Sequence, residues 1–410
     1  MMLAVDSGQI ICQHLPIVRK TLRVAVVTET YPPEVNGVAM TISHMVSGLR
    51  QRRHQVQLIR PRQGWRDNAA SEPNFEEVLQ LGVAIPRYDC LKIGLPAKQA
   101  LLRLWSVKRP DLVHVVTEGP LGWSALAAAV KLNIPCSSDF HTNFHSYSKH
   151  YGIGWLRKPI VAYLRKFHNK ANCTLVPTAS MRADLEGNGY LNLRVVARGV
   201  DTRRFHPGKR SIALRQQWGV TPRQPVAMYV GRLAPEKNLP VVSQAFSAMK
   251  SVRPDARLVV VGDGPERAAL QASNPDFIFA GMRTGDDLAA HYASGDVFLF
   301  PSTTETYGNV TVEAMASGLA VIAYDYAAAA EHVRHGRNGL VADLDNTQEF
   351  IHLAANLVND PRRIAEFGCR ARETAERIDW EHVHEEFEAT LLNVAAEQES
   401  PAGDPVGLPA

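Results

Sequence analysis

Two glutamates, Glu305 and Glu313, lie in the segment of this chain whose residue types are best suited to chemistry. Residues 301–318 read PSTTETYGNVTVEAMASG, so seven residues separate the two acids. The preceding run, Asp296–Phe300, is apolar and rich in β-forming residues, which predicts a buried strand that ends where the acids begin. Asn309–Ser317 then predicts a helix ended by Gly318, with Glu305 in the loop and Glu313 within the helix.

This loop-to-helix junction suits the recognition of a nucleotide sugar. Free backbone N–H groups at a helix start bind anions, and the helix dipole favours negative charge there. Carboxylates accept hydrogen bonds from pairs of hydroxyls, so one acid can hold a hexose and the other a ribose. An acidic helix start beside a surface loop gives the same pattern, so the interpretation depends on the neighbouring motifs.

Length and composition predict a protein with two α/β domains. The chain has 410 residues, too many for one ordinary core, and its 45% hydrophobic and 21% charged content is typical of globular proteins. A net charge of +4, without a basic stripe interleaved with aromatics, argues against nucleic-acid binding. The five scattered cysteines form no C-x-x-C pair, which argues against disulfides and zinc and favours a cytoplasmic setting.

The two ends of the sequence predict no folded structure. Residues 1–20 have an early acid and polar interruptions, which is typical of a loose extension and not of a secretory signal. Residues 397–410, EQESPAGDPVGLPA, predict a disordered tail. No run approaches the roughly 18 apolar residues of a membrane span, so any membrane association is expected to be peripheral, on the inner face.

Short Val/Ile-rich runs alternate with helical patterns, which predicts two doubly wound, Rossmann-like parallel sheets facing each other. The predicted strands are Arg23–Val27, Gln55–Ile59, Asp111–Val116, Ile134–Phe140, Cys173–Val176 and Arg194–Ala197, then Val226–Val230, Arg257–Val261, Phe277–Phe279, Val297–Phe300, Ala320–Ala323 and Leu340–Ala342. The segment FHPGKR at 205–210 predicts a boundary between domains at 21–206 and 207–378. Apolar residues at helical spacing over 379–396 predict a last amphipathic helix.

Further motifs follow predicted strands and therefore lie at the sheet edges where ligands bind. TETYPPEVNGV at 28–38 places Gly37 before a helix, where the backbone can approach a phosphate. GRLAPEKN at 231–238 brings Arg232 and Lys237 together, suited to neutralising a departing diphosphate. VGDGPER at 261–267 supplies Asp263 and Gly264 but lacks the third glycine of the dinucleotide fingerprint, which argues against hydride transfer. Plain turns and solvated surface cations are the alternatives.

Two further motifs, one with a histidine and one with paired aspartates, lie at or after predicted strands. DFHTNFH at 139–145 places His141 at a strand end, although a structural histidine bound to a backbone carbonyl is the alternative. No D-x-D follows a suitable strand, as metal-dependent sugar transfer would require. Asp343-Leu344-Asp345 follows the final strand and is typical of a solvated turn.

Taken together, NGV at 36–38, FHTNFH at 140–145, GRLAPEKN, GDGP at 262–265 and ETYGNVTVEAMASG at 305–318 resemble the retaining glycosyltransferases of family 4. The resemblance covers about residues 22–394. It implies a GT-B fold, with the last helix crossing back onto the N-terminal domain. The C-terminal domain would then bind the nucleotide sugar and the N-terminal domain the acceptor.

The resemblance also implies roles for individual residues. Glu305 would approach the donor hexose, Glu313 would hold the ribose, Arg232 and Lys237 would bind the diphosphate, and His141 would contact the sugar. These residues other than Glu313 form the implied catalytic set. The implied donor-binding set is Gly37, Gly231, Asp263, Gly264, Met282, Arg283, Tyr307, Gly308, Asn309, Val310 and Glu313, with Met282 and Arg283 beside the base.

The implied mechanism is front-face substitution with retention, in which the diphosphate oxygen takes the acceptor's proton and no metal is required. Two features depart from the family pattern. Asn36 stands where many members carry glycine, and Asp325–Ala330, DYAAAA, replaces a frequent Gly-Gly turn. The second departure affects the expected donor contacts.

An amphipathic basic segment, Trp155–Lys170, suggests contact with an anionic membrane surface, and Lys98–Arg109 repeats the pattern. Core packing of the apolar face is the favoured alternative. The expected acceptor is a lipid such as diacylglycerol or a lipid-linked glycan. The expected donor is GDP-mannose, UDP-glucose, UDP-glucuronate or a related sulfo-sugar. A nucleotide-sugar 2-epimerase and a non-catalytic nucleotide-binding protein remain alternative functions.

Overall fold

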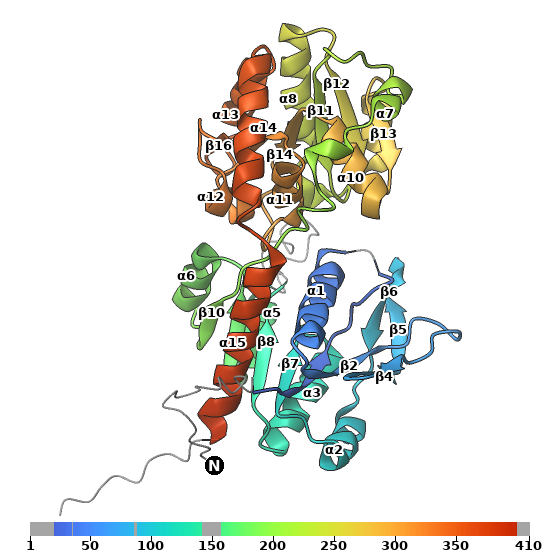
Figure 1. Cartoon of the computed structure of the whole chain (residues 1–410), viewed down its shortest axis with the longest axis vertical. Helices are drawn as coiled ribbons and strands as arrows, with labels where there is room; N and C mark the ends of the chain where they lie inside the picture. Colours follow the sequence, from blue (N-terminus) through green and yellow to red (C-terminus); the bar gives the residue numbers. More distant parts are fainter. Residues whose placement is uncertain (1–19, 35, 86–87, 142–156, 400–410) are drawn as a thin grey trace, which may run out of the picture.

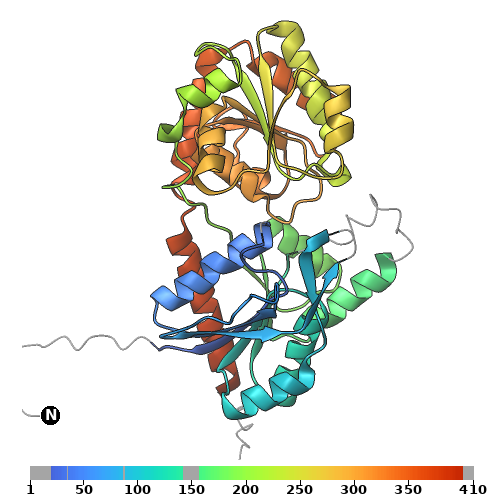
Figure 2. The same cartoon turned by 90° about the vertical axis from the view of Figure 1, so that its right-hand side faces the viewer.

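The computed structural model describes residues 20–34, 36–85, 88–141 and 157–399. Two α/β domains are stacked along the long axis of the molecule, and the final helix runs from their junction along the N-terminal domain (Figures 1 and 2). Each domain has a sheet between layers of helices. The predicted fold class of two doubly wound domains is therefore confirmed.

The N-terminal sheet has the strand order β10-β9-β8-β7-β1-β2-β4-β3, and only β3 runs antiparallel to its neighbour. Its strands are β1 Arg23–Val27, β2 Gln55–Pro61, β3 Ser71–Glu72, β4 Phe75–Gln80, β7 Leu112–Val115, β8 Cys136–Asp139, β9 Cys173–Val176 and β10 Leu193–Val195, with a separate hairpin of β5 Gly82–Ile85 and β6 Tyr88–Gly94. The helices of this domain are α1 Gly37–Gln51, α2 Lys98–Val107, α3 Pro120–Lys131, α5 Arg157–His168 and α6 Ala179–Gly187.

The C-terminal sheet is fully parallel in the order β13-β12-β11-β14-β15-β16. Its strands are β11 Val226–Val230, β12 Arg257–Val261, β13 Ile278–Gly281, β14 Val297–Phe300, β15 Ala320–Tyr324 and β16 Gly339–Ala342. The helices are α7 Ile212–Gln217, α8 Leu239–Val252, α9 Arg267–Ser273, α10 Gly285–Ser294, α11 Asn309–Ala316, α12 Ala327–His332, α13 Thr347–Leu357 and α14 Pro361–Ala375. Strands β11, β14 and β15 are buried along their whole length, as expected for a parallel sheet covered on both faces.

The last helix, α15 Trp380–Glu399, belongs to the packing of the N-terminal domain although it follows the C-terminal sheet. Val383, Phe387 and Leu391 are buried in the same cluster as β1 and α1 residues. The Trp380 ring stacks on His44 of α1 with centroids 4.4 Å apart. The amphipathic pattern therefore identified a helix that crosses back between the domains.

Every strand predicted from the sequence is present, with ends within two residues of the prediction. The sequence patterns missed β3 to β6. Strand β4 is only half-buried after Phe75 and carries two glutamates, so it lacks the apolar run of a central strand. Its pairing with β2 becomes evident only in the folded sheet.

Candidate functional site

The loop that carries Glu305 connects β14 to α11 at the carboxyl edge of the C-terminal sheet. The buried strand ends at Phe300, and α11 begins at Asn309. Gly308 adopts φ 90°, a left-handed conformation that glycine tolerates best, and a Cβ there would lie 3.4 Å from Glu305 Cγ. This glycine therefore lets the chain turn tightly from the glutamate into the helix.

Glu305 is held by three contacts that come from different elements. Its carboxylate forms an ion pair with Lys237 and accepts a 2.7 Å hydrogen bond from Ser302 Oγ. Its backbone carbonyl accepts a 2.8 Å hydrogen bond from Tyr326 OH. The Lys237 and Glu305 side chains are only 13% and 16% exposed, so their charges are poorly screened by solvent. The predicted cation and the predicted acid thus share one site.

Arg232 lies on the same loop as Lys237 and is 40% exposed. Its Nη1 is 3.8 Å from the buried Glu236 carboxylate, and the Glu236 carbonyl accepts a 3.3 Å hydrogen bond from Thr304 Oγ1. Thr304 immediately precedes Glu305, so this network ties the arginine loop to the glutamate loop. The arrangement leaves a partly exposed guanidinium on a loop that is tied to the glutamate loop.

Three glycines bring the loops after β11 and β12 into direct backbone contact. A Cβ on Gly262 would lie 2.0 Å from the Gly231 carbonyl oxygen, and one on Gly264 would lie 2.3 Å from the Leu233 carbonyl oxygen. Gly231 has φ 154°, Gly262 φ 133° and Gly264 φ 158°. Asp263, between them, accepts hydrogen bonds from Gly264 N at 2.8 Å and Arg267 Nη1 at 2.7 Å. The GDGP motif therefore shapes this edge of the sheet through close backbone packing.

The N-terminal domain places the start of α1 opposite the start of α11. A Cβ on Gly37 would lie 3.7 Å from Asn309 Nδ2, so the first residues of the two helices are neighbours across the domain junction. Asn36 caps α1 by accepting a 2.8 Å hydrogen bond from Ala39 N, which explains this departure from the family pattern. Two helix N-termini at one place favour a negatively charged ligand through their dipoles.

Glu313 lies one turn into α11 and its carboxylate accepts a 3.0 Å hydrogen bond from Tyr292 OH. Burial raises the pKa of this carboxyl to about 7. Because the ionised acid has a single hydrogen-bonding side-chain partner among the contacts of the described residues, it has lone pairs available for the hydroxyls of a ligand.

The other residues predicted to bind the sugar donor differ in exposure and in their contacts. Met282 is 56% exposed just after β13, and Arg283 binds the Ala280 carbonyl at 2.9 Å and Asp287 at 3.1 Å. Val310 packs, partly buried, against the C-terminal core. The structure thus brings Glu305, Lys237 and the α11 start together, whereas Arg283 is engaged with its own loop and helix.

His141 has its ring turned into the N-terminal domain and is 6% exposed. Its Nε2 lies 2.9 Å from Asp139 Oδ2, and its Nδ1 accepts a 3.2 Å hydrogen bond from Arg198 Nη2. Both ring nitrogens are therefore engaged inside the protein in this conformation. The group that His141 presents to the glutamate loop is its backbone carbonyl, which accepts a 3.0 Å hydrogen bond from Thr306 Oγ1.

Several residues of this site were not identified from the sequence. Ser302 and Tyr326 fix Glu305, Tyr292 binds Glu313, and Thr306 and Arg198 connect the loop to the N-terminal domain. Tyr326 belongs to the DYAAAA segment, whose Ala327 has φ 52°, a conformation in which the glycine frequent in the family would be unstrained. The segment therefore turns through a left-handed residue at Ala327 and adds a tyrosine contact to the glutamate loop.

On the N-terminal side, Glu29 and Glu118 lie at the carboxyl ends of β1 and β7. Glu29 Oε1 accepts a 2.9 Å hydrogen bond from Leu121 N at the start of α3, and burial raises the pKa of its carboxyl to about 7. Glu118 Oε1 lies 3.3 Å from His168 Nε2. The acids thus border the same edge of the sheet as Gly37.

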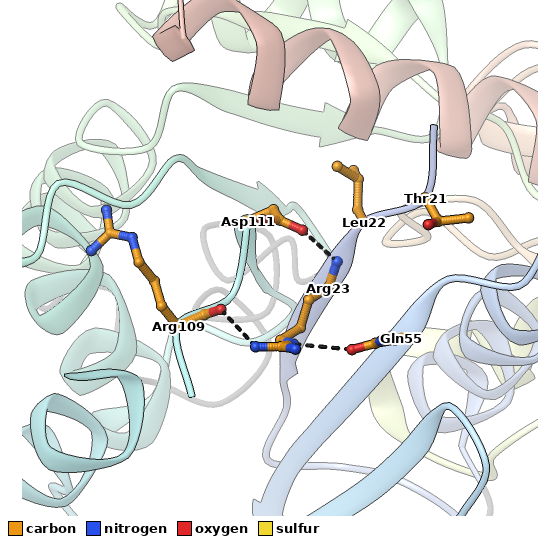
Figure 3. A pocket seen from close by; sticks show the side chains of 6 residues that line it. All are labelled: Thr21, Leu22, Arg23, Gln55, Arg109 and Asp111. Carbon is orange, nitrogen blue, oxygen red and sulfur yellow. Dashed lines mark hydrogen bonds between the residues drawn. The ribbon is translucent and has the colours of Figure 1, made fainter. Parts of the chain in front are cut away.

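A hollow of about 230 Å³ lies at the opposite, amino-terminal edge of the N-terminal sheet (Figure 3). Arg23 crosses it, with its backbone N–H donating to Asp111 at 2.7 Å and its guanidinium donating to Gln55 at 3.1 Å and to the Arg109 carbonyl at 3.3 Å. These contacts satisfy the arginine within the fold. The hollow is therefore separate from the residues that the motifs single out.

The amphipathic segment proposed for membrane contact is α5, preceded by residues outside the described ranges. Leu164 and Phe167 of α5 are buried, so core packing describes its apolar face. Lys158, Arg165 and Lys166 are exposed. Likewise, α2 buries Leu101, Leu102 and Trp105 and exposes its basic residues. The exposed surface of these helices therefore carries basic residues, together with the exposed Val107 of α2 and Tyr163 of α5.

The described part of the chain contains neither a candidate metal site nor a helix that could span a membrane. Within these residues, no cluster of three or more His, Cys, Asp or Glu side chains has the arrangement of a metal site. Over the same ranges, no helix has the length and apolar character needed to cross a membrane.

Comparison with known protein families matches both domains. Residues 35–204 match the model described as Glycosyltransferase Family 4, and residues 224–360 match the one described as Glycosyl transferases group 1. The GDP-mannose-dependent alpha-mannosyltransferase of Corynebacterium glutamicum is 34% identical over 365 residues, covering 88% of this chain and 86% of that protein. The enzyme of the same name from Mycolicibacterium smegmatis is 33% identical, over 90% of this chain and 98% of that protein.

Solved structures share the architecture at low sequence identity. Sucrose-phosphate synthase from Thermosynechococcus elongatus superposes with a TM-score of 0.76 at 17% identity, covering 92% of this chain and 99% of that one. Anabaena HepE in complex with UDP-glucose gives a TM-score of 0.71 at 18% identity, covering 91% and 100%. These likenesses confirm the two-domain fold expected from the sequence.

Proposed function

Because the chain belongs to glycosyltransferase family 4, a family of retaining enzymes with the GT-B fold, we propose that it transfers mannose from GDP-mannose to a hydroxyl of a lipid or lipid-linked acceptor. The observation that carries the proposal is the Lys237–Glu305 pair beside the start of α11. The relatives from Corynebacterium and Mycolicibacterium bear the name of GDP-mannose-dependent enzymes, which supports mannose as the transferred sugar.

In the proposed complex, the donor diphosphate lies between the Arg232–Lys237 loop and the facing starts of α1 and α11. Glu305 holds the hexose hydroxyls, and Glu313 accepts from the ribose. The acceptor oxygen forms its bond to the anomeric carbon on the face from which the diphosphate leaves. The C–O bond to the diphosphate breaks, and the diphosphate oxygen takes the acceptor's proton. Positioning and charge stabilisation supply the catalysis.

The charge on the leaving diphosphate is neutralised, in this proposal, by protein groups alone. Arg232, Lys237 and the helix N-termini occupy the place where a metal ion would otherwise act. Transfer is therefore expected to continue at full rate after dialysis against EDTA. A rate that falls on chelation and returns with added Mg²⁺ or Mn²⁺ would contradict this part of the proposal.

Donor affinity is expected to depend on pH through Glu313, since burial raises the pKa of its carboxyl from 4.5 to about 7. The ionised carboxylate accepts the ribose hydroxyls, so the Kd for intact nucleotide sugar should rise by roughly tenfold per unit as pH falls below 7. The same raised pKa means that the folded state binds this proton more tightly than the unfolded state does. Ionisation of Glu313 above pH 7 therefore lowers the free energy of unfolding, and this loss disappears as the pH falls toward 4.5.

The measurement is calorimetric titration of GDP-mannose between pH 5.5 and 8.5, with Glu313→Gln as the matched variant. The variant should bind more weakly at pH 8 and show a flat profile. A profile for the variant as steep as that of the wild type would place the titrating group elsewhere.

We further propose that the exposed cations of α5 hold the enzyme at an anionic membrane surface. Lys158, Arg165 and Lys166 are exposed on a helix whose Leu164 and Phe167 are buried, so the contact would be mainly electrostatic. Reversing these three charges to glutamate should weaken binding to phosphatidylglycerol-containing vesicles by roughly tenfold or more at low salt. Reversal of Arg334, Arg337 and Arg370 on the C-terminal domain is the control. Equal sedimentation of both variants would contradict the assignment.

The transfer itself is tested with a panel of GDP-, UDP- and ADP-sugars. Thermal shift identifies the nucleotide, and mass analysis of lipids follows incubation with diacylglycerol or a lipid extract. The expected product is a glycolipid one hexose heavier than its acceptor, with the α configuration retained. Conversion of the donor sugar without acceptor would favour the 2-epimerase, and binding without any turnover would favour a nucleotide-binding protein.

A further inference from the structure

The two residues that follow Glu305 connect the C-terminal domain to the N-terminal domain. Thr306 Oγ1 donates a 3.0 Å hydrogen bond to the His141 carbonyl. Tyr307 OH donates a 3.0 Å hydrogen bond to the Arg198 carbonyl, and its side chain is buried. The loop that positions the catalytic glutamate is therefore also a loop that spans the domain junction.

The two accepting carbonyls belong to residues whose side chains are linked to each other. Arg198 Nη2 donates to His141 Nδ1 at 3.2 Å, which leaves His141 Nε2 to carry the hydrogen that it donates to Asp139 Oδ2 at 2.9 Å. Arg198, Asp139 and the His141 ring are all nearly inaccessible to solvent. A buried, charge-assisted network of this kind holds the two carbonyls at a fixed separation.

On the C-terminal side, Tyr307 is fixed by His332 of α12, whose Nε2 lies 2.9 Å from the tyrosine oxygen. Burial lowers the pKa of His332 to about 4, so the ring is neutral at pH 7. A tyrosine hydroxyl has one hydrogen, which it gives to the Arg198 carbonyl. His332 Nε2 therefore carries the hydrogen in the contact with Tyr307, and the hydrogen bonds run in one direction across the junction.

We propose that Thr306 and Tyr307 act with Arg198 as an interdomain latch that positions the Glu305 loop against the N-terminal domain. The same contacts keep the start of α11 opposite the start of α1, where Gly37 and Asn309 are neighbours. In this role His141 and Arg198 are positioning residues that act through their carbonyls. The effect of the latch on transfer rests on the proposed function, whereas its effect on domain arrangement does not.

The test removes both hydroxyls without changing side-chain volume, in the double variant Thr306→Val and Tyr307→Phe of the full chain. Loss of two ordinary hydrogen bonds shifts an open–closed equilibrium by roughly ten- to hundredfold. The expected result is a fall in kcat of that size, with the Kd for GDP within about twofold of wild type, because the proposed nucleotide contacts lie mainly in the C-terminal domain. Small-angle X-ray scattering should show a larger radius of gyration.

Two further variants separate a latch from a general structural role. Thr306→Ser, in a chain that keeps Tyr307, retains the hydroxyl, so its kcat should be near the wild-type value. Thr390→Val is the matched control, since it removes a 2.8 Å hydrogen bond from a threonine to the Glu386 carbonyl within α15. It should change neither kcat nor the radius of gyration.

Wild-type values of kcat and radius of gyration in the double variant would overturn the proposal. So would a parallel loss of GDP binding and kcat, since a latch acts after the nucleotide is bound. If the double variant fails to fold, the single substitutions carry the test, each with a kcat roughly three- to tenfold lower. If no donor is turned over, so that the proposed function itself fails, the scattering comparison alone decides on the latch.

Discussion

Replacing Lys237 by methionine is expected to lower kcat for sugar transfer by roughly 10²–10³-fold, the loss typical when one preorganised charge or donor is removed from a reacting centre. Lys237 is paired with Glu305, and both side chains are mostly shielded from solvent. In the proposed complex its ammonium contacts the leaving diphosphate, where a poorly solvated charge is worth more than in bulk water. The measurement is steady-state transfer from saturating GDP-mannose, so that the change appears in kcat.

The matched control is Lys250→Met, which removes the ion pair of Lys250 with Asp276 on the surface of the same domain. An exposed pair contributes little to stability, so this variant should keep full activity. Thermal melting checks that Lys237→Met still folds, because the substitution leaves Glu305 without its cation. A kcat for Lys237→Met within about threefold of wild type would remove Lys237 from the mechanism.

Replacing Gly37 by leucine is expected to lower kcat/KM by roughly 10²-fold or more, because even the first side-chain carbon would lie 3.7 Å from Asn309 Nδ2. The longer side chain would occupy the space between the starts of α1 and α11, which the proposal assigns to the diphosphate. Gly37 has an ordinary negative φ and is exposed, so the substitution introduces no backbone strain. The loss should therefore appear in catalysis and not in the melting temperature.

Gly187→Leu is the control for this substitution, since Gly187 is also helical and a Cβ there would meet nothing within 4 Å. It should retain wild-type kcat/KM. An active Gly37→Leu enzyme would show that the diphosphate does not pass between the two helix starts, even if Lys237 proves essential.

Much of the candidate site could be predicted because it depends on a general property of parallel sheets. The carboxyl ends of β11 and β14 lie at one edge, so the residues after each strand meet there. That rule placed Lys237 and Glu305 together although 68 positions separate them in sequence. The helix over Asn309–Ser317 could also be predicted, since Gly318 ends it with the left-handed backbone conformation that glycine favours.

Contacts between the domains could not be predicted in the same way. Which carbonyl meets Thr306 or Tyr307 depends on how two rigid bodies are oriented, and no local pattern encodes that. The orientation of the His141 ring depends on Asp139 and Arg198, and Arg198 lies 57 positions away. For α5, the periodicity showed an apolar face but not what covers it, and the structure shows that Leu164 and Phe167 pack in the core.

A crystal structure of the chain with GDP-mannose, or with GDP, tests the central claim most directly. We expect the diphosphate within hydrogen-bonding distance of Lys237 and Arg232 and of the backbone N–H groups at the start of α11, with Gly37 opposite and the ribose at Glu313. A nucleotide bound elsewhere, with Lys237 and Glu305 still paired to each other and contacting no ligand, would contradict it.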